Sequence, residues 1–249
     1  MTDPRISIID ERLKQINRII AVSSGKGGVG KSLIATTLAL ELARKGCKTG
    51  LFDLDFTSPT THIILGARNL QPTEDKGLIP PKINNLEYMS LIYYTTDKPA
   101  PLRGEDTSNI LIEMLAVTRW NKLDYLIVDM PPGIGDAVLD LIRLVKKIEF
   151  IIVTTSSRLA FETVRKLATL LQDQKVPIVG IIENMKMNKE DDSIKLQTKT
   201  LGLSYIGEIP FDSKVEDAIG NPMLLDTAIA KQINIVVQHL KPKNKNILQ

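Results

Sequence analysis

The sequence predicts an α/β fold in which helices flank a doubly wound, mostly parallel sheet. Short apolar runs rich in β-branched residues, typical of buried parallel strands, recur along the chain. Between them lie stretches whose apolar residues are spaced three and four apart, as on one face of a helix. Strands that alternate with helices in this way pair in parallel, because each helix carries the chain back across the sheet.

Five apolar runs are expected to form the strands. They are Ile19 to Ser24, Lys48 to Asp53, Tyr125 to Asp129, Phe150 to Thr155 and Ile178 to Ile182. Three stretches with helical spacing lie between them, namely Ser32 to Arg44, Val138 to Val145 and Ala160 to Leu171. A chain of 249 residues can bury one large core, so we expect residues 1–249 to form a single domain.

Three segments depart from this rhythm. Residues 1–18 are expected to form an N-terminal helix, which packs either on its own domain or on a partner. Its apolar stripe consists of Ile6, Ile9, Leu13 and Ile16. The proline-rich residues 68–103 are interpreted as a surface excursion with one strand, Leu86 to Ile92. Residues 241–249 are expected to form a frayed tail.

Composition argues against several classes of protein. The formal net charge of +3 is too small for the basic footprint of a nucleic-acid-binding protein. One cysteine, Cys47, rules out an intramolecular disulfide, and with only His62 and His239 beside it a dedicated metal cage is not expected. Cys47 is expected to be a partly buried packing residue. No apolar run has the length of a signal peptide core or a membrane span, so we expect a soluble cytoplasmic protein without a membrane partner.

A glycine-rich segment between the first predicted strand and the first predicted helix carries the strongest functional motif. It reads Gly25-Lys26-Gly27-Gly28-Val29-Gly30-Lys31-Ser32 and satisfies G-x-x-x-x-G-K-[ST]. Glycines let successive N–H groups turn toward a polyphosphate, and the following helix adds its positive end. Lys31 is expected to reach the β- and γ-phosphates and the Ser32 hydroxyl to ligate Mg²⁺. The loop and the next residue, Leu33, are therefore predicted to bind a nucleotide.

The second lysine of this loop, Lys26, is unusual, because it cannot easily share its own phosphates with Lys31. The sequence GKGGVGKS resembles the deviant Walker A loop of the Mrp/MinD group of P-loop ATPases. The resemblance implies a SIMIBI-like P-loop NTPase fold. It also implies an ATP-dependent homodimer in which Lys26 reaches the partner's phosphates and acts, with Lys31, in catalysis.

Two acidic segments extend the resemblance. Asp53 and Asp55 follow a predicted strand, at the sheet edge where open α/β sheets bind ligands. By resemblance to the family's first switch, Asp55 would orient the attacking water and Asp53 would support Mg²⁺ through water. Asp129 ends a buried strand before Pro131-Pro132-Gly133, which resembles the Walker B strand and second switch of the Mrp branch. Asp129 would hold a water bound to Mg²⁺, and the Gly133 backbone would sense the γ-phosphate.

The base is expected to be adenine, although one motif favours guanine. Asn188-Lys189-Glu190-Asp191 matches the N-K-x-D pattern of GTPases, but it lies beyond the strand end in a charged loop where such matches arise by chance. By family resemblance, the adenine pocket consists of Asn184 at the strand end together with Pro210 and Asp212, in a segment that follows the last strand. ATP and Mg²⁺ are therefore the expected cofactors. Asp136 is expected to cap the helix that starts at Ala137.

The segment after Asn184 departs from the Mrp pattern and guides the functional expectation. Mrp-type iron–sulfur carriers usually have a Cys-x-x-Cys pair here, whereas this chain has MKMNKEDDSIKLQ, so cluster carriage lacks its thiolate ligands. The resemblance is judged nearest to the archaeal ATPase-type HypB factors of nickel–iron hydrogenase maturation, which implies an ATP-gated enhancer of nickel loading on a HypA-like metallochaperone. The alternatives are an Mrp/ApbC-like iron–sulfur cluster carrier that lacks this pair and a MinD/ParA-like positioning ATPase.

Overall fold

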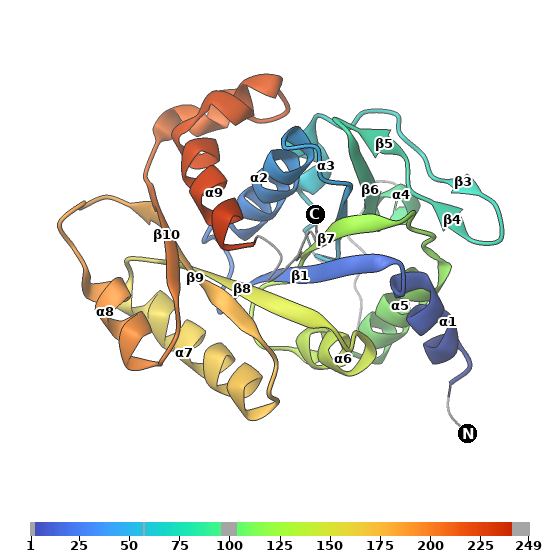
Figure 1. Ribbon diagram of the computed structural model, residues 1–249, viewed down its shortest axis with the longest axis horizontal. Coiled ribbons are helices and arrows are strands. Elements are labelled where there is room, and N and C mark those ends of the chain that lie inside the picture. Colours follow the sequence, from blue (N-terminus) through green and yellow to red (C-terminus); the bar gives the residue numbers. More distant parts are fainter. Residues whose placement is uncertain (1–2, 57, 96–103, 241–249) are drawn as a thin grey trace, which may run out of the picture.

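The computed structural model describes residues 3–56, 58–95 and 104–240, and its centre is an eight-stranded sheet (Figure 1). The strand order is β10-β9-β8-β1-β7-β2-β6-β5. The bounds are β1 Ile16–Ser24, β2 Thr49–Asp53, β5 Lys82–Ile83, β6 Leu86–Ser90, β7 Leu123–Asp129, β8 Ile148–Thr155, β9 Ile178–Lys186 and β10 Tyr205–Pro210. All neighbours in this sheet pair in parallel except β5 and β6. The predicted doubly wound α/β fold is confirmed.

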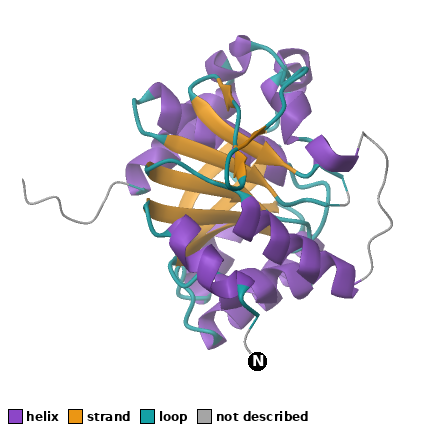
Figure 2. Cartoon of the chain, turned by 90° about the vertical axis from the view of Figure 1, so that its right-hand side faces the viewer, coloured by secondary structure: helices purple, strands orange, loops and turns teal. Residues whose placement is uncertain are grey.

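Helices cover both faces of the sheet, so its strands are buried on either side (Figure 2). One face packs against α2 (Lys31–Arg44), α3 (Thr61–Leu65), α9 (Ala228–His239) and the 3₁₀ helices η1 (Ser213–Ala218) and η2 (Pro222–Asp226). The other packs against α1 (Arg5–Leu13), α5 (Gly104–Val117), α6 (Asp136–Leu144), α7 (Arg158–Asp173) and α8 (Ser193–Thr200). Burial on both faces explains why the strands read as continuous apolar runs rather than as alternating patterns.

The register of the central strands positions the site. Asp129 of β7 lies opposite Val22 of β1 on one side and opposite Asp53 of β2 on the other. The carboxyl ends of three neighbouring strands therefore meet at one sheet edge, next to the glycine-rich loop that follows β1. Open parallel sheets bind their ligands at such an edge.

The N-terminal helix is shorter than predicted and packs on its own domain. It ends at Leu13, and Ile16 belongs to β1, where it pairs with Leu123, so its place in the helical stripe was wrong. Ile9 and Leu13 are buried beside α5 and α6. The alternative in which this stripe docks on a partner is thereby excluded.

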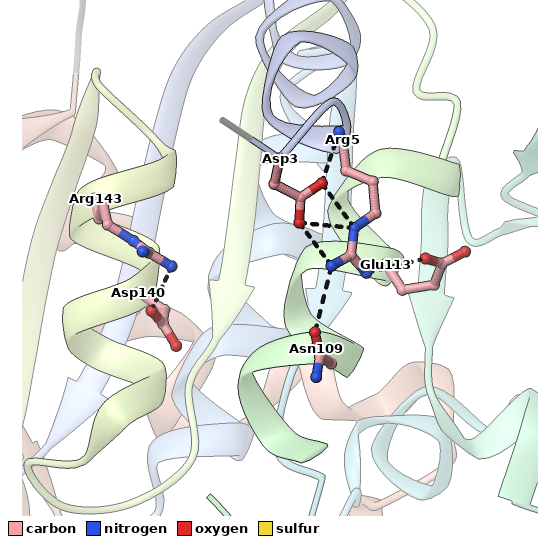
Figure 3. A network of polar contacts seen from close by, with 6 residues as sticks. All are labelled: Asp3, Arg5, Asn109, Glu113, Asp140 and Arg143. Atoms are coloured by element: carbon pink, nitrogen blue, oxygen red, sulfur yellow. Dashed lines mark hydrogen bonds and ion pairs between the residues drawn. The ribbon is translucent and has the colours of Figure 1, made fainter. Parts of the chain in front are cut away.

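Polar contacts fix α1 further onto its neighbours (Figure 3). Arg5 donates to both carboxylate oxygens of Asp3 and to Asn109 of α5, and it lies 3.6 Å from Glu113 of the same helix. Asp140 of α6, paired with Arg143, accepts a hydrogen bond from Ser108 of α5, so α5 and α6 are joined as well.

Residues 68–103 are more than a surface excursion. Within them β6 is wholly buried and joins the main sheet beside β2, with β5 antiparallel to it. Two short strands, β3 (Thr73–Glu74) and β4 (Leu78–Ile79), form a separate antiparallel pair. The expected strand ends at Ser90 because α4 (Ile92–Thr95) begins directly afterwards. Residues 96–103 and the tail 241–249 lie outside the described residues. Of the helices described, none is long and apolar enough to cross a membrane.

The packing of α1 leads to a stability prediction. Ile9→Ala should lower the free energy of unfolding by about 2–4 kcal/mol, because it leaves a cavity where a fully buried side chain packs against α5. Ile8→Ala is the matched control, since the Ile8 side chain is 43% exposed, and it should change stability by less than about 0.5 kcal/mol. Urea denaturation measures both. Equal losses for the two variants would contradict the packing described here.

Candidate functional site

The glycine-rich loop joins β1 to α2 and is shaped by its neighbours. Gly28 and Gly30 have φ angles of 76° and 82°, in the left-handed region that favours glycine. A Cβ atom on Gly30 would come within 2.2 Å of Asn184 Nδ2, and one on Gly25 within 2.2 Å of Thr163 Oγ1. Residues 25 and 30 therefore admit only glycine without rearrangement. The first turn of α2, which has no side-chain cap, presents its N–H groups to this loop, as phosphate sites do.

Lys31 lies at the centre of a buried charge cluster. Its Nζ donates to Asp129 Oδ1 at 2.6 Å and lies 3.2 Å from Ser32 Oγ and 3.7 Å from Asp55 Oδ2. Only 5% of Lys31 is exposed, so this ammonium is held largely by carboxylates rather than by water. The sequence-predicted residues of the phosphate end are thus brought together around one cation.

Asp129 retains acceptor capacity inside this cluster. Its Oδ2 atom is buried and accepts no hydrogen bond within the part of the chain that is described. Burial raises the pKa of Asp129, and the Lys31 ammonium opposes that rise. A free carboxylate oxygen beside the Ser32 hydroxyl is the kind of oxygen donor set that Mg²⁺ prefers, so these residues fit the predicted ion.

Asp53 is fully engaged by protein donors. Its Oδ1 accepts the backbone N–H of Asp55 at 3.0 Å, and its Oδ2 accepts the hydroxyl of Thr61 at 2.5 Å. Burial, together with the nearby charge of Asp129, raises the pKa of Asp53 to about 7. Asp53 therefore anchors the loop that follows β2. Its predicted support of Mg²⁺ through water stays a prediction.

Asp55 is held beside Lys31, and Thr61 contacts a further buried hydroxyl group. The Oδ1 atom of Asp55 accepts the N–H of Ser58 at 3.2 Å, while Oδ2 faces Lys31. The Thr61 hydroxyl also lies 2.9 Å from the hydroxyl of Tyr88, a buried residue of β6. Sequence reasoning missed Thr61 and Tyr88, because one lies in a run of small polar residues and the other in the segment taken as a surface excursion.

The loop after β7 contacts the loop after β1. Gly133, with a φ angle of 89°, donates its N–H to the Ser24 carbonyl at 2.9 Å. Lys26 is exposed, and its carbonyl accepts the Ser24 hydroxyl at 2.9 Å. The expected capping role of Asp136 is wrong, because Gly135 is the N-cap of α6 and Asp136 is an exposed residue of the first turn.

The residues predicted for the base pocket lie near the ends of β9 and β10. Asn184 is buried at the end of β9 and donates to the Val29 carbonyl at 2.9 Å, so it braces the glycine-rich loop. Pro210 ends β10 instead of following it, because the segment from Gly207 lies within that strand. Asp212 accepts the N–H of Lys214 at the start of η1, and Leu33 packs against the core.

The N-K-x-D match forms turns of its own. Asn188 Oδ1 accepts the N–H of Glu190 at 3.0 Å, and Asp191 Oδ1 accepts the N–H of Ser193 at 2.9 Å. These side chains therefore cap the local chain.

Cys47 is partly buried against the core, as predicted, and burial raises the pKa of its thiol.

Comparison with known proteins identifies similar chains. A family model, ParA, described as NUBPL iron-transfer P-loop NTPase, matches residues 15–241. An iron–sulfur cluster carrier protein of Methanocaldococcus jannaschii is 34% identical over 94% of this chain and 88% of its own length. Proteins with the same name from Escherichia coli and Pseudomonas fragi are 42% and 39% identical, over 70% and 71% of this chain. The chain spans only 48% and 63% of the length of these two proteins.

Solved structures agree on the fold. A nucleotide-binding protein from Archaeoglobus fulgidus in complex with ADP superposes with a TM-score of 0.72 at 28% identity, covering 95% of this chain and 94% of the other. The cell division ATPase MinD of Pyrococcus furiosus gives a TM-score of 0.68 at 19% identity, covering 90% and 98%, which shows likeness of fold alone.

These comparisons confirm the Mrp/MinD-type P-loop resemblance and overturn the nickel interpretation. The relatives at 34–42% identity are named iron–sulfur cluster carrier proteins, and the matched family model describes iron transfer. The expected closeness to HypB, the role in hydrogenase maturation and the HypA-like partner are therefore wrong. The absence of the Cys-x-x-Cys pair misled the expectation, because a missing motif does not identify another task.

The position of Lys31 leads to a binding prediction. Lys31→Ala should weaken ATP binding by about 100-fold or more, because it removes two or more charge-assisted contacts of about 1.5–3 kcal/mol each from the phosphate end. Lys45→Ala, an exposed lysine at the other end of α2, is the control and should bind normally. Isothermal titration measures both, after melting curves show that each variant folds. An ATP affinity for Lys31→Ala within about threefold of wild type would contradict the role of Lys31.

Proposed function

Because this chain belongs to the ParA family of iron-transfer P-loop NTPases, we propose that it is an ATP-driven switch that serves the transfer of iron–sulfur clusters. One observation carries the proposal: Lys31 of the glycine-rich loop is buried against Asp129 and Asp55, in a chain whose relatives are named iron–sulfur cluster carriers. Residues 1–249 are proposed to act as one P-loop domain.

Nucleotide binding is assigned to residues at the carboxyl edge of the sheet. The backbone of the loop Gly25 to Ser32 would hold the phosphates, and Lys31 would turn from Asp129 toward them. Ser32 and Asp129 would hold Mg²⁺, with Asp53 behind them, and the ion would neutralise charge on the β- and γ-phosphates. Support comes from the free Oδ2 atom of Asp129 and from the uncapped first turn of α2.

Hydrolysis is assigned to Asp55, and adenine is the proposed base. The assignment is supported by exposure: Asp55 is 7% exposed and Asp53 is 1% exposed, so a water molecule would reach Asp55 more readily. Adenine is favoured over guanine because the Asn188 and Asp191 side chains are occupied by their own turns. Asn184, Pro210 and Asp212 remain the proposed adenine pocket.

The exposed Lys26 supports a nucleotide-dependent homodimer. Its side chain lies at the surface of the loop, while Lys31 lies inside it. Two lysines on one loop that face different directions can serve two sets of phosphates, one in each protomer. Lys26 is therefore proposed to complete the site of a second copy of this chain.

The iron–sulfur cluster is proposed to be cargo that this chain does not ligate itself. The only cysteine of the sequence, Cys47, lies between α2 and β2, at the end of β2 opposite to Asp53. Within the described ranges, no group of three or more His, Cys, Asp or Glu residues could hold a metal ion. These residues do not fit a cluster, whose irons require thiolates, so the thiolates would come from another protein.

The assignment of Asp55 leads to a kinetic prediction. Asp55→Asn should bind ATP with nearly wild-type affinity but hydrolyse it about 100-fold more slowly, because the amide keeps the shape and loses the carboxylate that orients water. Asp173→Asn, which changes an exposed carboxylate at the end of α7, is the control for the substitution and should keep most of the wild-type turnover. Single-turnover phosphate release is the measurement. Unchanged turnover in Asp55→Asn would move the catalytic role to another residue.

The cargo proposal is tested by transfer and by retention. With ATP, the chain should accelerate reactivation of cluster-free aconitase by a [4Fe–4S] cluster held by a small dithiol, and Asp55→Asn should not. After anaerobic incubation with ferrous iron and sulfide, the chain alone should retain neither after gel filtration.

The transfer assay and the retention assay can each contradict a different part of the proposal. No acceleration by ATP in the transfer assay would refute the function in cluster transfer. Stoichiometric retention of iron and sulfide by the chain alone would show that it ligates the cluster, against the assignment of the thiolates to another protein.

A further inference from the structure

A line of hydroxyl groups leads from the site into the neighbouring strand. The Thr61 hydroxyl, at the start of α3, donates to Asp53 Oδ2 at 2.5 Å and lies 2.9 Å from the hydroxyl of Tyr88 on β6. Thr61 and Tyr88 are fully buried, and Asp53 nearly so. Water therefore cannot replace any member of this line without a change of structure.

The direction of the hydrogen bonds follows from the number of protons. A threonine hydroxyl has one proton, and Thr61 gives it to Asp53. When Asp53 is ionised, the contact with Tyr88 uses the phenol proton, so Tyr88 donates to Thr61. Burial raises the pKa of Tyr88, which keeps its proton in place. The two hydrogen bonds thus run from the Tyr88 hydroxyl to the Thr61 hydroxyl and from there to the Asp53 carboxylate, and each hydroxyl proton is donated once.

The line ends on the loop that carries Asp55. The second oxygen of Asp53 accepts the backbone N–H of Asp55, and Leu54 donates its N–H to the Asp129 carbonyl at 2.9 Å. The start of the loop is thus tied to β7, and Thr61 ties its end to the side chain of Asp53. Both ends of the segment 54–60 are fixed to the sheet beside Asp55.

The supports of this line are themselves rigid. Tyr88 lies opposite Leu51 of β2 and makes an edge-to-face contact with Tyr93 at 5.8 Å between ring centroids. Helix α3 is held from its other side, where the N–H of Gly220 donates to the Ile64 carbonyl at 3.1 Å. A hydroxyl held between a strand and a short helix can define the position of a loop because neither support moves freely.

We propose that Thr61 and Tyr88 are positioning residues for hydrolysis, which hold residues 54–56 and 58–60 so that the Asp55 carboxylate stays beside Lys31. This inference rests on the proposed role of Asp55 in hydrolysis. It assigns a task to β6, the strand that belongs to the proline-rich residues 68–103.

Four variants test the proposal by separating binding from turnover. Tyr88→Phe and Thr61→Val should each lower kcat about tenfold, since small displacements of a reacting group cost that much or more, while KM and nucleotide affinity change less than about twofold. Thr61→Ser keeps the hydroxyl and should restore most of kcat. Tyr88→Phe combined with Asp55→Asn should be no slower than Asp55→Asn alone, because Tyr88 acts through Asp55.

Tyr125→Phe is the matched control. Tyr125 is a buried phenol that donates to the Leu240 carbonyl at 2.8 Å, away from the site, so its loss should lower the melting temperature without lowering kcat. Wild-type kcat in both Tyr88→Phe and Thr61→Val would overturn the proposal. So would an equal loss of kcat in Tyr125→Phe, or a failure of Thr61→Ser to restore turnover.

A second measurement keeps the proposal independent of ATP hydrolysis. If the wild-type chain shows no turnover, the function proposed for Asp55 fails, and the loop is then followed by hydrogen exchange. Thr61→Val should speed amide exchange at Asp55 and in the rest of residues 54–56 and 58–60 relative to Tyr125→Phe. Equal exchange in the two variants would show that Thr61 and Tyr88 do not hold the loop.

Discussion

The burial of three carboxylates around one ammonium governs the organisation of this protein. Asp53, Asp55 and Asp129 lie at the ends of adjacent strands or just beyond them, and Lys31 is the cation that contacts two of them, at 2.6 Å and 3.7 Å. Parallel pairing brings these acids together, and the glycine-rich loop is what allows Lys31 to enter from the next element. Because the acids outnumber the ammonium, the cluster carries excess negative charge away from water. Such a cluster is costly unless a proton or a further cation balances it.

The structure shows how part of this excess is absorbed. Asp53, which is buried, has a pKa raised to about 7 by burial and by the charge of Asp129. It is also the one whose two oxygens are occupied by Thr61 and the Asp55 backbone. Asp129 instead keeps one oxygen, Oδ2, that accepts no hydrogen bond from the residues described. The two carboxylates are therefore differentiated by their surroundings, one as an anchor of the loop and the other as a candidate ligand.

The sequence predicted what short-range patterns determine and missed what long-range contacts determine. The glycine-rich loop, the buried strands and their carboxyl-end acids are encoded in contiguous residues, and they were found within a few positions. Ile16 was misassigned because an apolar residue at helical spacing also suits the first position of a buried strand. The place of β6 was missed because prolines beside it suggested a loop, although its pairing with β2 is decided by residues far apart in the chain.

The same distinction limits what a motif says about function. Lys31, Asp55 and Asp129 were predicted to handle phosphate because that chemistry requires such groups at the carboxyl edge of the sheet, and the structure brings them together there. The cargo is not encoded there. Cys47 is separated from this edge by the length of β2, so the sequence contains no thiolate that could pass a cluster to or from the nucleotide site. A link between the nucleotide site and an iron–sulfur cluster would therefore run through a change of shape rather than through a thiolate at this edge. The loops that carry Asp55 and Gly133 are the elements in direct contact with the site, and the hydroxyl line through Thr61 and Tyr88 connects the first of them to the sheet.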